Sequence, residues 1–278
     1  MNPTPGNLLL VALVSVAFGC LGRSPEPLCD GSDGPRLRTQ FGGSGMLYPG
    51  SQVLSENGYD FLVVDGQCHF WVQTKAFGDV RTGTLEFSQS AKLSEALKLD
   101  TWSGLEGTYQ SSLCDGPWML YRFAAHRMSV QPYCNGPNTA ERIAWLREQT
   151  RSEIERLHAQ GTPVDGPVRY VLVIDEGMFP AGSDAYRNAP LWPLATPAAS
   201  LAITVMEANH YSAGESHLVP AGPDAQSLRS IAADFRAGSI GREYYHFIPI
   251  RDAEGRYYQF FVRDSIPIEN EQGLWRAE

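Results

Sequence analysis

The segment 206–217, MEANHYSAGESH, holds the closest grouping of side chains that could carry out chemistry. Glu207, His210, Glu215 and His217 supply carboxylates and imidazoles, which are the donors that bind zinc. Their spacing differs from the helical HExxH motif, in which two histidines one turn apart hold the ion. We therefore predict a polar loop here, and we assign no catalytic residue, metal or cofactor to the chain.

Aromatic side chains crowd a second segment, the last hairpin that the sequence predicts, over 244–250 and 256–262. Adjacent residues of a strand point to opposite faces of its sheet, so one set of rings can fill the core while the other stays exposed. Two interpretations are open. Either Tyr245 and Tyr258 belong to an exposed face that stacks on sugars or docks a protein partner, or the rings pack against each other across the strands.

The cysteines predict disulfide chemistry. The chain has five of them, an odd number, at Cys20, Cys29, Cys68, Cys114 and Cys134. An antiparallel meander over 36–73 would bring Cys29 to Cys68, and a hairpin over 118–133 would bring Cys114 to Cys134. We predict these two disulfides, which leave Cys20 unpaired. A zinc site built from the four would need CxxC-like spacing, which the sequence lacks.

The N-terminus predicts export. Residues 8–18, LLLVALVSVAF, form an apolar run too short to span a bilayer but suited to the central region of a signal peptide. The small residues Ala17 and Gly19 stand where a signal peptidase requires them, although no Lys or Arg precedes the run. The stretch 17–20 resembles the lipobox of bacterial lipoproteins, in which the cysteine is lipidated after cleavage. The resemblance makes Cys20 the expected membrane anchor, and ordinary secretion is the rival interpretation.

Composition limits the classes of partner. The chain has 278 residues, 43% of them hydrophobic and 19% charged, which is typical of a globular protein with its own core. Its formal net charge of -9 argues against nucleic acid and against electrostatic docking on anionic lipid.

Periodicity and turn signals predict an α+β fold: antiparallel sheets and hairpins packed with one long helix, 138–160, and shorter helices. A turn-rich break over 161–167 suggests either two domains or one bilobed unit. The expected organisation is a signal peptide over 1–19, a tether over 20–35, a disulfide-bearing α+β domain over 36–162 and a second α+β domain or lobe over 163–278.

Several motifs together resemble uncharacterised bacterial lipoproteins: the lipobox-like start, CDGSDG at 29–34, VDGQC at 64–68, CDGPW with the later PYC, and RDSIP at 263–267. The resemblance implies localisation and disulfides, and it supplies no activity. We therefore expect a lipid-anchored protein of the bacterial cell envelope, on the outer membrane or periplasmic face. Its expected role is non-catalytic binding or structure, with a protein or glycan partner. The alternative is a secreted or anchored hydrolase without a recognisable motif.

Overall fold

The computed structural model describes residues 26–42, 60–74, 79–113, 118–133, 136–175, 177, 184–204, 216–238 and 247–267. Within them the chain forms an α+β protein with an eight-stranded and a four-stranded sheet, which confirms the predicted class. The eight-stranded sheet, called sheet A, uses strands from residues 35–163, and the four-stranded sheet B uses strands from residues 168–264.

Sheet A is antiparallel throughout except at one edge, where β5 runs parallel to β7. Across the sheet the strands are β5 (Gly107–Ser111), β7 (His126–Pro132), β6 (Met119–Phe123), β1 (Pro35–Phe41), β2 (Asp60–Asp65), β3 (His69–Gln73), β4 (Arg81–Thr84) and β8 (Thr162–Pro163).

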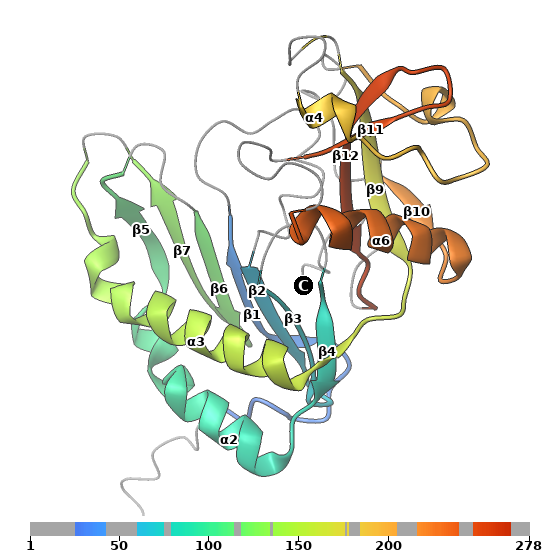
Figure 1. Cartoon of the computed structure of the whole chain (residues 1–278). Coiled ribbons are helices and arrows are strands. Elements are labelled where there is room, and N and C mark those ends of the chain that lie inside the picture. Colours follow the sequence, from blue (N-terminus) through green and yellow to red (C-terminus); the bar gives the residue numbers. More distant parts are fainter. Residues whose placement is uncertain are drawn as a thin grey trace, which may run out of the picture.

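One face of sheet A, here called the inner face, packs against two helices, α2 (Phe87–Ala96) and α3 (Ala144–Gln160) (Figure 1). Alternate strand residues such as Leu37, Tyr121 and Met128 are buried there, as period-two patterning requires. A 3₁₀ turn over Ala140–Ile143 leads directly into α3, so the two together form the long helix that the sequence predicts. A second 3₁₀ helix, Leu99–Gly104, follows α2.

Sheet B is antiparallel and places its longest strands at its centre. Its order is β10 (His217–Val219), β9 (Val168–Ile174), β12 (Tyr257–Asp264) and β11 (Ile248–Arg251). Helix α6 (Pro223–Arg236) crosses one face and buries Leu228 and Phe235 in a core of its own, separate from that of sheet A (Figure 1). The short α4 (Asp184–Arg187) and a 3₁₀ helix, Ala198–Ser200, complete the described elements.

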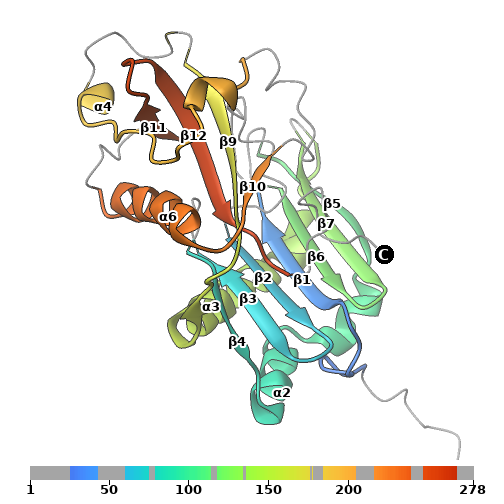
Figure 2. The ribbon, with the colours of Figure 1, turned by 90° about the vertical axis from the view of Figure 1, so that its right-hand side faces the viewer.

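The two sheets meet through a third apolar cluster on the face of sheet A away from α3, here called the outer face. Phe61, Val63 and Trp71 of sheet A pack there against Val80 and against Ile266, which follows β12. Figure 2 shows sheet B beside this part of sheet A. An ion pair adds to the junction, because Arg229 of α6 lies 2.6 Å from Asp264, whose other oxygen accepts from the Val80 amide at 3.4 Å.

Sequence periodicity missed three short edge strands, β5, β8 and β10. Each has five residues or fewer, and β8 lies inside the predicted break at 161–167, where two residues pair with β4. The apolar run over 201–206 makes, among its described residues, a single bridge from Ile203 to Val173. Such segments carry too few alternating positions for a period to be read.

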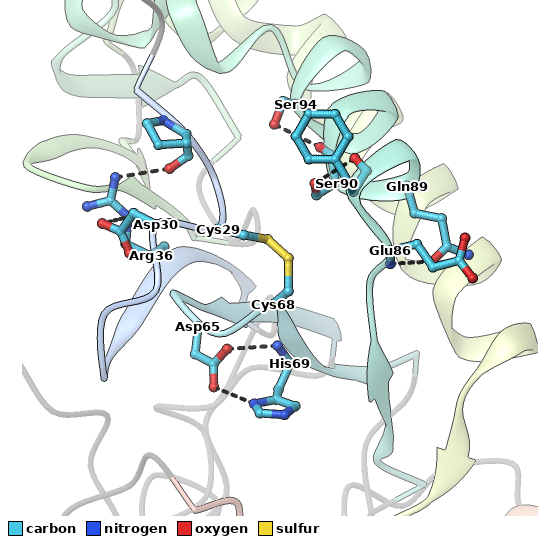
Figure 3. Close-up of a disulfide and its surroundings, with 12 residues drawn as sticks. Cys29, Asp30, Arg36, Asp65, Cys68, His69, Glu86, Gln89, Ser90 and Ser94 are labelled. Carbon is cyan, nitrogen blue, oxygen red and sulfur yellow. Dashed lines mark hydrogen bonds and ion pairs between the residues drawn. A yellow bond between two sulfur atoms is a disulfide. The ribbon is translucent and has the colours of Figure 1, made fainter.

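The predicted disulfide between Cys29 and Cys68 is confirmed, with the two Cα atoms 5.1 Å apart (Figure 3). It joins the CDGSDG segment to the turn between β2 and β3. Two backbone hydrogen bonds accompany it: the Gly31 amide donates to the Gly66 carbonyl (2.7 Å), and the Gly66 amide donates to the Gly34 carbonyl (3.0 Å). Cys114 and Cys134 lie outside the described residues, so their pairing stays a prediction.

The close approach of these two segments explains why residue 66 is a glycine. A Cβ atom on Gly66 would overlap both the carbonyl oxygen and the hydroxyl of Ser32, so no larger residue fits without separating them. The two motifs, CDGSDG and VDGQC, are therefore parts of one structural unit, here called the disulfide unit and defined as residues 29–34 and 64–68.

Removing the disulfide should destabilise the folded chain. The bond spans 39 residues, a loop for which restriction of the unfolded chain contributes about 4 kcal/mol. We expect the double variant Cys29→Ala, Cys68→Ala to unfold at a correspondingly lower urea concentration. Equal urea midpoints for the variant and the wild type would contradict this prediction.

Candidate functional site

The outer face of sheet A carries three arginines side by side, on three neighbouring strands. Arg38 of β1 is directly opposite Arg122 of β6, and Arg122 is directly opposite Arg127 of β7. We call these three residues the arginine row. Strands lie about 4.8 Å apart, so the row spans roughly 10 Å. Like charges directly opposite each other destabilise a sheet. Folding alone therefore gives no reason for this arrangement.

Two of the three positive charges, those of Arg122 and Arg127, have no partner within the described residues. Arg38 donates a hydrogen bond to the amide oxygen of Gln40 (2.7 Å), which is neutral. Neither Arg122 nor Arg127 forms an ion pair or a side-chain hydrogen bond with the described part of the chain. By contrast the nearby Arg36 is neutralised by Glu26, at 2.9 Å, and by Asp30, at 3.2 Å.

The arginine row lines a cavity of about 560 Å³, which is within the size range of small-molecule sites. One wall of the cavity comes from the disulfide unit, through Asp30, Ser32 and Asp33. The turn between β6 and β7 also lines the cavity. The Ser32 hydroxyl donates to the Asp30 carboxylate (2.6 Å), and this hydrogen bond lowers the pKa of Asp30. Asp30 therefore stays charged near neutral pH and holds Arg36 in place.

This chemistry suits binding better than catalysis. A guanidinium forks two hydrogen bonds onto a carboxylate or phosphate and does not exchange a proton at ordinary pH. Three histidines of the described chain do pair with carboxylates: His69 with Asp65 (3.0 Å; Figure 3), His158 with Asp79 (3.3 Å) and His126 with Glu106. None of these six residues lines the arginine cavity.

Of the two interpretations of the aromatic hairpin, packing in the core applies to Tyr258, and an exposed binding face does not. Its side chain is 2% exposed and belongs to the core under α6, because it alternates with Phe260 on the helix-covered face of β12. Its hydroxyl donates to the Asp252 carboxylate at 2.8 Å, and burial with this bond raises the pKa of Tyr258 to about 12. Burial opposes charge on Asp252, but the hydrogen bonds from Tyr258 and Arg256 outweigh it and lower the pKa of Asp252.

The other predicted site residues stay largely untested. Tyr245, Cys20, Glu207, His210 and Glu215 lie outside the described residues. His217 is described: it sits in β10, where its ring lies 5.0 Å from that of Tyr170. Among the described residues, no three His, Cys, Asp or Glu side chains gather as a metal site would require.

Sequence reasoning missed the arginine row, although a signal was available. Arg122 and Arg127 stand symmetrically about the Ala124-Ala125 turn of a hairpin that the sequence does predict. Pairing the hairpin residue by residue would have placed them opposite each other. The third member could not be found in this way, because the pairing of β1 with β6 joins segments about 80 residues apart.

Comparison with known proteins gives no family model that matches the chain, and no curated protein or solved structure matches it either. Within the described residues, no helix has the length and apolar character needed to cross a membrane. The apolar run at 8–18 lies outside the described residues.

The crowding of the arginine row can be tested without any ligand. We expect Arg122→Gln to stabilise the protein by about 0.2–1 kcal/mol at low ionic strength, because it relieves two like-charge contacts. The gain should shrink in 1 M salt, which screens charges beyond about 3 Å. The measurement is urea unfolding at both salt concentrations.

Arg156→Gln is the matched control. Arg156 lies 2.6 Å from Glu153, so this variant removes an ion pair and should destabilise the protein. If Arg122→Gln is destabilising at low salt, the arginine row is not a source of repulsion.

Proposed function

We propose that this chain is an exported protein of the bacterial cell envelope, anchored through lipid on Cys20, that binds an anionic ligand on the arginine row without transforming it. The observation that carries the binding role is that Arg122 and Arg127 line a cavity and form no ion pair with the described part of the chain. Two arginines directly opposite each other on neighbouring strands destabilise the folded sheet. A ligand that supplies the missing negative charge would explain why both are present.

The disulfide supports the exported part of the proposal. Disulfides persist in oxidising compartments and are rare in the cytosol. The bond between Cys29 and Cys68 removes two of the five cysteines, so the count that singles out Cys20 now rests only on the pairing of Cys114 with Cys134.

The walls of the cavity restrict the ligand to a compact anion. Glu26, Asp30 and Asp33 line the cavity beside the arginines. A long polyanion such as nucleic acid would meet this acidic wall, whereas a single carboxylate or phosphate group can sit on Arg122 and Arg127 alone. An acidic sugar of an envelope glycan or an acidic side chain of a protein partner has this chemistry.

The tether would hold the site close to the membrane. Glu26 follows Cys20 by six residues, and an extended chain covers at most about 3.6 Å per residue. The arginine cavity would thus lie within roughly 20 Å of a lipid anchor at Cys20. The hydrolase alternative would be favoured by convergent carboxylates or by a histidine–carboxylate pair in one cavity. The three described histidine–carboxylate pairs lie outside the arginine cavity, and two of its three carboxylates, Glu26 and Asp30, are paired with Arg36.

Lipidation of Cys20 has a direct measurement. We expect the protein extracted from bacterial membranes to start at Cys20 and to carry added acyl mass, as read by intact mass spectrometry. Cys20→Ala should be released from the membrane fraction. A Cys20 without acyl mass would show that secretion, not anchoring, is correct.

Ligand binding by the arginine row is tested by isothermal titration of the mature protein with inorganic phosphate and with citrate at low salt. We expect the double variant Arg122→Met, Arg127→Met to bind at least about tenfold more weakly, since each charge-assisted hydrogen bond is worth about 1.5–3 kcal/mol. Arg156→Met is the control and should bind like the wild type. Equal affinities for the double variant and the wild type would refute the site.

A further inference from the structure

A second cavity lies on the opposite face of sheet A, between the sheet and the start of α3. Its volume is about 490 Å³. The apolar side chains of Met119, Val130 and Ile143 line it, and all three are buried. Leu113, which is 61% exposed, also lines it. This cavity, here called the inner cavity, shares no residue with the arginine row.

Two cations of α3 line the inner cavity. Arg147 and Arg151 are four residues apart, so they share a helix face, where like charges destabilise a helix. Neither forms an ion pair with a described carboxylate, and the Arg147 Nε atom is buried without a hydrogen-bond partner. The Arg151 guanidinium lies 5.7 Å from the centre of the Phe41 ring. Glu148, three residues before Arg151 on α3, offsets part of this repulsion, but it forms no ion pair with either arginine.

Buried hydroxyls accompany these arginines. Tyr121, another lining residue, is fully buried, and within the described residues its hydroxyl donates one hydrogen bond, to the Met119 sulfur at 3.4 Å. Thr39 lies directly opposite Tyr121 on β1, and Thr150 lies between the two arginines on α3. Both threonine hydroxyls are buried without a partner in the described structure. A native protein has few such groups, and each calls for an explanation.

The protonation of Tyr121 suits donation to an anion. Burial raises the pKa of Tyr121, while the positive charges of Arg147 and Arg151 oppose that rise. The phenol therefore keeps its proton at neutral pH. Arg147, Arg151 and Tyr121 all line the inner cavity, so an acceptor group bound there would have three hydrogen-bond donors around it.

We propose that the inner cavity binds a small aliphatic monocarboxylic acid. Its carboxylate accepts hydrogen bonds from Arg147, Arg151 and the Tyr121 hydroxyl, and its alkyl chain packs on the apolar lining. Glu141 and Glu148 also line the cavity, so a multiply charged anion such as phosphate is repelled there. The proposal does not depend on the arginine row or on the anchor at Cys20.

The test compares decanoate with decanol, which has the same chain and no charge, by isothermal titration of the mature protein. We expect decanoate to bind at least about tenfold more tightly than decanol, and Arg147→Met to remove that preference. Arg156→Met, which lies on α3 outside both cavities, is the control and should leave decanoate binding unchanged. Equal binding of the two ligands, or loss of decanoate binding in Arg156→Met, would overturn the proposal.

A measurement on the wild type guards against a variant that does not fold. With methyl-labelled methionines, bound decanoate should give nuclear Overhauser contacts to Met119, which lines the inner cavity, and none to Met128, which is buried outside its lining. Contacts to Met128 without Met119 would place the ligand elsewhere and refute the site.

Discussion

The covalent link between Cys29 and Cys68 determines how the outer face of sheet A is used. The segment 29–34 has no helix or strand of its own to hold it, and its glycines and aspartates favour turns. Tied to the turn between β2 and β3, it becomes a fixed wall. Asp30 then holds Arg36, and the cavity beside the arginine row acquires a rigid acidic side.

Sheet A separates two cavities that arginines line and that differ in the polarity of their other lining residues. On its outer face, Arg122 and Arg127 stand next to an acidic wall in a polar cavity. On its inner face, Arg147 and Arg151 stand over apolar side chains and buried hydroxyls. In both places like charges are neighbours, which a sequence selected for stability alone would avoid. Each pair of arginines has carboxylates in the same lining, Glu26, Asp30 and Asp33 on the outer face and Glu141 and Glu148 on the inner face.

Sequence patterns predicted those features that depend on local periodicity. The meander, the hairpin around Ala124, the long helix before Gly161 and the pairing of Cys29 with Cys68 all follow from alternation, turn residues and cysteine placement. The arginine row could not be predicted in this way, because β1 pairs with β6, which lies about 80 residues further along the chain. The burial of Tyr258 was also hidden, since alternation alone does not show which face of β12 the helix α6 covers.

The position of the disulfide has a mechanical consequence. A pull on the N-terminus reaches Cys29 before it reaches β1, and the covalent bond passes the load to Cys68, in the turn between β2 and β3. Because β2 is flanked by β1 and β3 in the sheet, the force enters at an internal strand. Peeling β1 away from its neighbours, which breaks hydrogen bonds one at a time, is thereby avoided. Traction on the tether should be resisted by several strands together.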